Sequence, residues 1–291
     1  MLTNLFRLDG TPKILEVGEM PPMSPGDTVA NIVFPPGEWS PSNRKIRKVK
    51  FISVAFSKTK ISQITFIDCS FEDCLFIGAH IDEVEFHGCE LVNCNFWKIR
   101  LTRVYLRPDK VKLARRFRSE AANVGISIFQ EMLANFAEQR QDQFFMQADI
   151  QFRRWKRYQI WHDLRQERKR LNEALWEWIS SKTYECTCGF GYRPLRFFIC
   201  TLALFSTISY LNYIIIGDAI QVAGTISTAE SPAHASFVDT VFYSFSILTV
   251  LGFSTVTPAS DTAKMLAVIE ALASIGWLGM FTAVLVKRFL R

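Results

Sequence analysis

Residues 249–258 read Thr-Val-Leu-Gly-Phe-Ser-Thr-Val-Thr-Pro, and the segments on either side of them decide the fold of the C-terminal part. Residues 195–216 and 265–286 are apolar runs of 22 residues, each long enough to cross a bilayer at 1.5 Å per residue. The apolar run directly before the stretch, residues 237–249, has 13 residues and is too short to cross. The sequence therefore predicts two membrane spans joined by a short re-entrant helix and an extended loop.

This order of segments resembles the pore of two-span potassium-channel-like proteins, in which the loop reads Thr-Thr-Val-Gly-Tyr-Gly-Asp-Ile-Thr-Pro. The chain keeps the family residue at four positions and changes it conservatively at three, which are Thr249, Gly252, Thr257 and Pro258, and Leu251, Phe253 and Val256. The resemblance implies a homotetramer whose backbone carbonyls replace the water shell of a cation. It places the selectivity filter at residues 249–254, which are Thr249, Val250, Leu251, Gly252, Phe253 and Ser254.

The chain departs from the family at Val250, Ser254 and Thr255, and two of these positions lie where ions would bind. Val250 lacks the hydroxyl that the family Thr offers to the innermost cation. Ser254 replaces a Gly with φ above zero, a conformation that costs a residue with a Cβ about 1–2 kcal/mol. We therefore expect a cation pore that conducts potassium and excludes sodium less strictly.

The second span contains three candidates for a gating hinge. Counted from Pro258, the hinge glycine of the family aligns with Ser274, and Gly276 and Gly279 are close enough to serve instead. The alternative role of these small residues is close helix packing. Glu270 is a charge inside a span, so we expect either an ion role or a pairing behind the filter.

Charge placement predicts the orientation in the membrane. Residues 153–196 hold eleven Lys and Arg against five acidic residues, and residues 197–263 hold no Lys or Arg. This pattern predicts cytoplasmic termini, and with the resemblance it indicates a bacterial inner membrane. Acidic residues of the outer loop would concentrate cations at the mouth, and they are Asp218, Glu230 and Asp261. Asp239 joins them or stabilises the N-terminus of the short helix.

A repeat of five residues occupies the N-terminal half. Large apolar residues stand at every fifth position, namely Phe51, Phe56, Ile61, Phe66, Phe71, Phe76, Ile81, Phe86, Leu91, Phe96, Leu101 and Leu106. The pattern resembles the pentapeptide-repeat family, which implies a right-handed four-sided β-solenoid of three coils. Residues 20 apart would stack inside it, Phe56 on Phe76 on Phe96 for example, and its ends would need caps.

Four cysteines, Cys69, Cys74, Cys89 and Cys94, stand in the small position two residues before an apolar one. They serve either as a metal or redox cluster or, as we prefer, as small buried fillers of the repeat. Cys186 and Cys188 are expected in a juxtamembrane loop, without a nearby partner for a metal.

The remaining segments are predicted from composition and helical period. Residues 1–43 are rich in Pro and Gly and are expected to form an extended arm. Helices are expected at 111–124, 126–140 and 143–180. The third carries an apolar stripe and a basic face. It either packs on its neighbours or lies on the inner leaflet, where Trp and basic residues bind anionic lipid.

The sequence thus predicts a mixed fold: an extended arm (1–43), a β-solenoid (44–108), a cytosolic helical connector (109–182), a juxtamembrane loop (183–196) and a two-span pore domain (197–291) with its re-entrant helix at 237–249. The function predicted is a tetrameric cation channel gated or assembled by the solenoid. The alternative is a membrane-tethered scaffold or sensor with a non-conducting pore.

We expect no enzymatic activity, catalytic residue, resident metal or cofactor, because the four His residues form no recognisable constellation. The bound species would be permeant K⁺ or other monovalent cations. Expected partners are three further copies of the chain, membrane lipids, and a cytosolic protein or ligand at the solenoid. The mixed charges of the repeat argue against a mimic of DNA, and a nucleic-acid partner is not expected.

Overall fold

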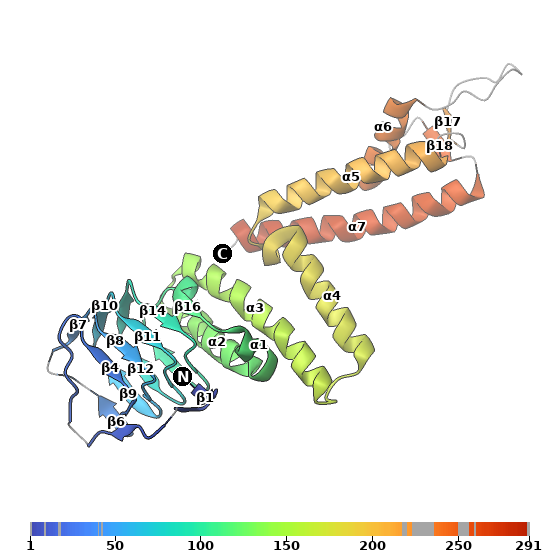
Figure 1. The fold of residues 1–291 in the computed structure, drawn as a ribbon. Coiled ribbons are helices and arrows are strands. Elements are labelled where there is room, and N and C mark those ends of the chain that lie inside the picture. The colour runs from blue at the N-terminus through green and yellow to red at the C-terminus, as the bar shows by residue number, and fades with distance from the viewer. Residues whose placement is uncertain are drawn as a thin grey trace, which may run out of the picture. The chain divides into compact units, whose positions relative to one another are not determined.

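The computed structural model describes residues 2–8, 10–16, 19–39, 41, 43–216, 220–222, 236–249, 256–258 and 260–289. The chain forms two compact units, Met1–Ser181 and Lys182–Arg291 (Figure 1). The first unit holds the β-solenoid and the helices that follow it, and the second holds two long apolar helices with a short one after the first.

The solenoid consists of parallel ladders whose register advances by 20 residues per coil. The first ladder pairs Ile46 with Phe66 and Phe66 with Phe86. Its strands are β7 (Lys45–Arg47), β10 (Thr65–Ile67) and β13 (Glu85–His87). The second contains β4 (Thr28–Ala30), β8 (Lys50–Ile52), β11 (Ser70–Glu72), β14 (Glu90–Val92) and β16 (Val111–Lys112). The third contains β6 (Gly37–Trp39), β9 (Thr59–Ser62), β12 (His80–Asp82) and β15 (Arg100–Thr102).

Single bridges Val33–Ala55, Ala55–Leu75 and Leu75–Asn95 add a further ladder. The predicted β-solenoid is confirmed, whereas its handedness stays a prediction.

The period of five has a backbone cause. Every fifth residue from Lys48 to Arg103 has a φ between 51° and 67°, the left-handed region that turns the chain at a corner. Only two of these corners are glycines, Gly78 and Gly88. The interior is filled by the predicted stacks: the rings of Phe56 and Phe76 lie 5.1 Å apart, and those of Phe76 and Phe96 lie 5.4 Å apart.

The solenoid begins earlier than the repeat indicates. Strands β4 and β6 lie in the segment that we expected to be an extended arm, and they add a coil before the first repeat. This coil is offset by 22 residues, Val29 pairing with Phe51 and Trp39 with Ile61, so the period of five does not reveal it. Further strands of the segment are β1 (Leu2–Asn4), β2 (Arg7–Leu8), β3 (Lys13–Ile14) and β5 (Ile32–Val33).

The other end of the solenoid is capped by a helix, as a stacked repeat requires. After η1 (Pro108–Lys110) come α1 (Arg115–Glu120) and α2 (Ala122–Glu138). Backbone N–H groups of the last coil donate to side chains four residues apart on α2: Lys98 to Ser127 Oγ (3.1 Å), Leu101 to Glu131 Oε2 (3.4 Å) and Val104 to Asn135 Oδ1 (2.8 Å). Asn135 Nδ2 also donates to the Val104 carbonyl (2.7 Å).

The helical connector differs from the prediction in three places. The expected helices over 111–124 and 126–140 are instead α1 and α2, which meet at Ala121, so Gly125 lies inside α2, and Val111 and Lys112 form β16. The expected helix over 143–180 is two helices, α3 (Asp142–Arg165) and α4 (Leu171–Cys188), separated by a turn in which Glu167 has a φ of 56°. The expected loop over 183–196 is wrong, because α4 continues to Cys188 and η2 (Gly189–Gly191) follows.

Helix α3 packs on α2, as the first of the two alternatives predicted. The Trp155 ring is 5% exposed and takes the place that a Cβ on Gly125 would occupy, so the close approach of the two helices requires glycine there.

The second unit contains α5 (Pro194–Ile216), β17 (Ile220–Val222), α6 (Phe237–Leu248), β18 (Val256–Pro258) and α7 (Asp261–Phe289). Helices α5 and α7 are long and apolar enough to cross a membrane, and α6 is the predicted short helix between them. The strands pair antiparallel, with Gln221 opposite Thr257, a contact that the sequence did not indicate.

We predict that Asn135→Leu opens the cap of the solenoid. It leaves the buried N–H of Val104 without its partner, which costs about 1–3 kcal/mol, and it leaves the Val104 carbonyl only the longer hydrogen bond from Gln139 Nε2 (3.4 Å). Hydrogen exchange of the full-length protein in detergent should show faster exchange of the amides in the last coil.

The control is Asn123→Leu, the same change at an exposed position of α2. Equal exchange in the two variants would contradict the capping role of Asn135.

Candidate functional site

The short helix α6 begins at a complete capping box. Asp239 N donates to Ser236 Oγ (3.2 Å) and Ser236 N donates to Asp239 Oδ2 (3.2 Å). Of the two alternatives for Asp239, the structure therefore shows the N-terminal one. At the other end the Thr249 hydroxyl donates to the Phe245 carbonyl (2.7 Å). The helix therefore ends at a defined residue, directly before residues 250–255 in the sequence.

One buried amide joins the three helices of the second unit. Asn212 on α5 is 0% exposed, and its Nδ2 donates to Ser244 Oγ on α6 (3.0 Å) and to Glu270 Oε2 on α7 (3.2 Å). The Ser274 hydroxyl donates to the Glu270 carbonyl (2.8 Å), one turn further along α7. Glu270 thus pairs with α5 beside α6, the second of the alternatives that the sequence left open.

Sequence reasoning missed Asn212 as a functional residue. Its signal was a single amide side chain within an otherwise apolar span, which is costly in lipid unless it is paired. Its partner Ser244 is 1% exposed and equally unremarkable in sequence.

Most of the predicted filter lies outside the described residues. Thr249 is described, whereas Val250, Leu251, Gly252, Phe253 and Ser254 are not, and neither are Asp218 and Glu230 of the predicted outer mouth. Asp261 is exposed in the first turn of α7 and pairs with Lys264 (3.1 Å). The filter and the acidic mouth therefore stay predictions.

The hinge candidates on α7 have different surroundings. Ser274 is 4% exposed and hydrogen-bonded, so it is part of the packing near Glu270. A Cβ on Gly276 or on Gly279 would meet no atom within 4 Å among the described residues. Neither glycine is therefore required for packing against the described residues of its own chain, and the gating hinge stays a prediction.

Helices α5 and α7 present broad apolar surfaces. Leu195 and Leu202 on α5 are 72% and 66% exposed, and Met265 and Leu272 on α7 are 64% and 66% exposed. Surfaces of this size are covered by lipid or by another chain.

A tight connection precedes α5, and we call residues 189–192 the elbow. Lys287 near the end of α7 donates from Nζ to the Phe190 carbonyl (2.8 Å) and lies 4.0 Å above the centre of the Tyr192 ring. Phe190 has a φ of 60° and is 1% exposed. A Cβ on Gly191 would come within 2.9 Å of Lys287 Cδ, so the contact between the elbow and α7 requires glycine there.

The end of α4 is buried against the spans. Cys188 is 0% exposed and packs with Phe197 and Val284, while Cys186 on the same turn is exposed. Both residues are helical rather than in the loop that the sequence predicted. Cys188 is thus a packing residue at this junction.

The four cysteines of the repeat lie in the solenoid core. Cys74 Sγ donates to the Phe51 carbonyl and Cys94 Sγ to the Phe71 carbonyl, both at 3.4 Å. Burial raises the pKa of the Cys94 thiol well above its usual value, which opposes the thiolate that metal binding needs. Their packing agrees with the filler role.

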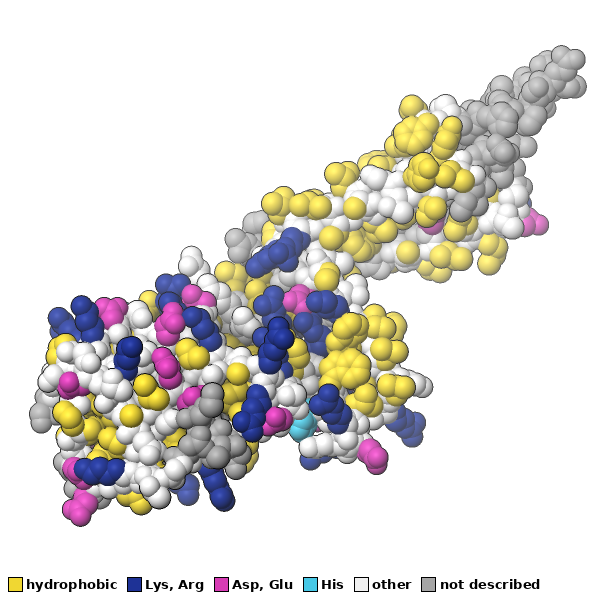
Figure 2. Space-filling model, in the orientation of Figure 1, with side chains coloured by type: hydrophobic (Ala, Val, Ile, Leu, Met, Phe, Trp, Pro, Cys, Tyr) yellow, Lys and Arg dark blue, Asp and Glu magenta, His cyan; other side chains and the backbone are white. Residues whose placement is uncertain are grey.

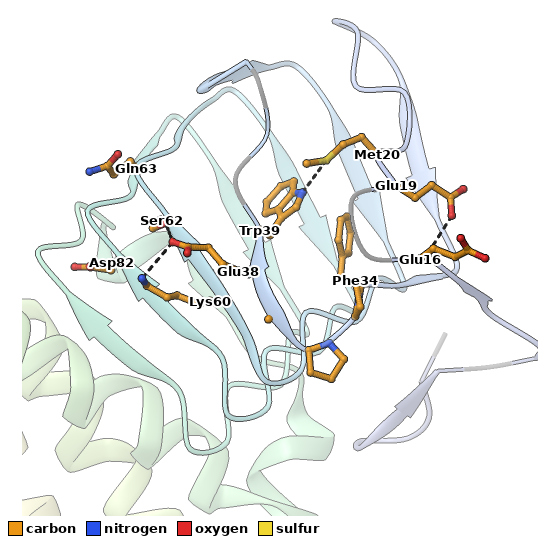
Figure 3. Close-up of a pocket in the computed structure, with 13 residues that line it drawn as sticks. Glu16, Glu19, Met20, Phe34, Glu38, Trp39, Lys60, Ser62, Gln63 and Asp82 are labelled. Atoms are coloured by element: carbon orange, nitrogen blue, oxygen red, sulfur yellow. Dashed lines mark hydrogen bonds and ion pairs between the residues drawn. The ribbon is translucent and has the colours of Figure 1, made fainter.

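A pocket of about 610 Å³ opens beside the first coil (Figure 3). Glu38 points toward Ser62 and Lys60 and accepts hydrogen bonds from them at 2.9 and 3.2 Å. The Ser62 hydroxyl and then Lys60 lower the pKa of Glu38, so it is ionised near neutral pH. On the opposite side Trp39 Nε1 donates to Met20 Sδ (3.2 Å). The lining of the pocket offers carboxylates, the ammonium group of Lys60 and aromatic edges.

Comparison with known families agrees with this division of the chain. Residues 197–291 match the family model of ion channels, and residues 69–107 match the model of pentapeptide repeats in eight copies. Curated proteins yield no match. The chain is thus a fusion of pentapeptide repeats with an ion-channel domain that contains α5, α6 and α7, and these features make it a membrane protein.

We predict non-additive effects at the buried amide. Asn212→Leu leaves Ser244 and the Glu270 carboxyl without their donor and should destabilise the packing of α6 by about 2–4 kcal/mol. Adding Glu270→Leu removes the stranded carboxyl, so the double variant should be more stable than Asn212→Leu alone. Thermal unfolding of the purified protein in detergent measures both.

Glu270→Leu alone completes a double-mutant cycle with these two variants. If the losses of stability in the two single variants simply add in the double variant, Asn212 and Glu270 act independently, which would contradict the three-helix contact.

Proposed function

We propose that this chain is the subunit of a tetrameric cation channel that conducts potassium and excludes sodium incompletely. The observation that carries the proposal is the pair of hydrogen bonds that fixes α6 between α5 and α7. Within the segment that matches ion channels, a helix too short to cross a membrane is pinned between two spans by Asn212, Ser244 and Glu270. A short helix of this kind is stable at membrane depth only when protein surrounds it.

Four copies around an axis would supply that surrounding protein, and they would cover part of the apolar surface of α5 and α7. The C-terminal end of α6 is the negative end of its dipole and directly precedes residues 249–254. A cation is favoured at such a place, and a ring of backbone carbonyls would replace its water. Val250 and Ser254 differ from the family filter, which supports weaker discrimination against sodium.

The orientation proposed is the one that the basic residues favour. Both termini, the solenoid and the helices α1 to α4 would lie in the cytoplasm of a bacterium, with α5 and α7 in its inner membrane. The pocket beside Glu38 would then face the cytosol, where a ligand or a protein partner of the solenoid can reach it. Ion-channel and repeat families are non-catalytic, which supports a protein that is not an enzyme.

Gating would act through the elbow. Lys287 lies near the end of α7, the helix that also carries Gly276 and Gly279, and it is held by Phe190 and Tyr192. Helix α4 leads from the cytosolic unit into this contact. A change in α4 would therefore pull on the inner end of α7 without touching residues 249–254.

The reversal potential of the full chain in planar bilayers, with potassium on one side and sodium on the other, tests the conduction proposal. We expect a potential between zero and the potassium equilibrium value. Val250→Thr combined with Ser254→Gly restores the family residue at these two positions and should move the potential toward that value.

An unchanged potential in the double variant would contradict the role of these two residues. No current under any voltage, with or without residues 1–182, would favour the alternative of a non-conducting scaffold.

We predict that Lys287→Met changes the ratio of open to closed channels about 10⁴-fold, because all four chains of the proposed tetramer lose the contact and switch together. The lost hydrogen bond and cation–π contact are together worth about 1–2 kcal/mol per chain. Single-channel recording measures the open probability, and the reversal potential should stay unchanged.

Lys264→Met is the control, because Lys264 also lies on α7 but near its first turn, at the other end from the elbow. A shifted reversal potential in Lys287→Met, or equal gating in the two variants, would contradict the coupling.

A further inference from the structure

Helix α4 carries a group of apolar side chains that face solvent together. Leu171, Leu175, Trp176 and Ile179 are 60%, 45%, 73% and 42% exposed, and their spacing places them on one side of the helix. We call these four residues the α4 face. Figure 2 shows a continuous yellow area over α4. Scattered exposed apolar residues are normal, whereas a contiguous group marks a contact surface.

Aromatic side chains extend this surface onto α3. Trp161 is 40% exposed, and its ring lies 6.3 Å from that of Trp178 in an edge-to-face arrangement. Tryptophan is enriched where an apolar phase meets water, because its ring is apolar and its N–H is polar. The composition of the surface is therefore that of an interfacial helix.

Basic side chains stand at the N-terminal end of the α4 face. Arg165, Arg168 and Arg170 are exposed, and none of the three forms an ion pair within the described residues. Lys169, between them, is paired with Glu177 (2.6 Å). Three arginine charges thus remain for a negatively charged partner next to an apolar surface.

The chain tethers the α4 face to the membrane. From Ile179 the helix continues to Cys188, and α5 begins at Pro194, so the face stays within about 35 Å of the span along the chain. A tethered surface meets its partner at a high effective concentration. Every copy of the chain therefore holds this surface close to lipid headgroups.

We propose that the α4 face and its three arginines dock on the anionic phospholipid headgroups of the leaflet next to them. The apolar side chains enter the headgroup region, and the arginines are attracted to the anionic surface. The same face of a second copy is the poorer occupant, because it would bring two sets of unpaired arginines together. The proposal rests on the membrane insertion of α5 and α7. It implies that the charge of the leaflet influences the contact between the elbow and α7.

The test uses the full chain in vesicles of phosphatidylcholine, with or without about one quarter phosphatidylglycerol. A fluorescent label is placed on Leu175→Cys in the α4 face or, as the matched control, on Glu173→Cys. Two residues correspond to about 200° around the helix, so these labels lie on opposite sides. Cys186→Ser removes the exposed native thiol from both. Nitroxide-labelled lipid then quenches whichever label touches the membrane.

We expect roughly twofold stronger quenching at position 175 than at 173 in the anionic vesicles, and a smaller difference in phosphatidylcholine alone. Arg168→Gln with Arg170→Gln, or high salt, should reduce the difference.

Equal quenching at the two positions overturns the proposal, and so does a difference that ignores phosphatidylglycerol. Self-quenching between labels at 175 without lipid quenching would assign the face to a second copy. The quenching needs no conduction: current with equal quenching refutes this inference alone, and a quenching difference without current refutes the channel alone.

Discussion

A polar group that is buried away from water and left unpaired costs several kcal/mol, and in the C-terminal unit the Asn212 amide nitrogen meets this constraint for its neighbours, whereas the Asn212 Oδ1 has no partner among the described residues. Helix α6 is too short to cross a membrane. The Ser244 hydroxyl on α6 and the Glu270 carboxyl beside it are polar groups inside this unit, and each needs a hydrogen-bond donor. One amide supplies both hydrogen bonds from α5, at 3.0 and 3.2 Å. The same contact fixes α6 against both spans and thereby sets where Thr249 ends the helix. The position of the proposed filter follows from this hydrogen-bond requirement rather than from apolar packing alone.

The same constraint shapes the last coil of the solenoid. A stack of coils pairs its backbone groups only between neighbours, so the terminal coils present open edges. Asn135 closes the last coil with two hydrogen bonds to Val104. Asn95 is 0% exposed and donates to the Leu5 carbonyl (2.6 Å), which holds the N-terminal strands on the solenoid. In each case an asparagine supplies the donor or acceptor that a repeat cannot supply for itself.

Periodic features could be predicted from the sequence, and single contacts could not. The apolar residue at every fifth position reveals the solenoid, and length with composition reveals the spans, because each signal is repeated many times. The coil of residues 28–39 escaped since its offset is 22 and Pro35 and Pro36 interrupt it. The break between α3 and α4 escaped because residues 166–170 contain neither Gly nor Pro. Asn212 and Lys287 act through two contacts each, and neither residue belongs to a repeated pattern.

In the proposed symmetric channel, the weak contact of Lys287 with the elbow would be sufficient for gating. A ligand or a lipid surface shifts a gate only by the difference in its free energy between the two states. The hydrogen bond and the cation–π contact of Lys287 are worth about 1.5 kcal/mol per chain. Four copies that switch together would supply about 6 kcal/mol, and about 5.5 kcal/mol moves a two-state equilibrium from 1:99 to 99:1. Cytosolic changes that contribute too little free energy in one subunit can therefore open or close the proposed tetramer, provided that its four copies of α7 move together.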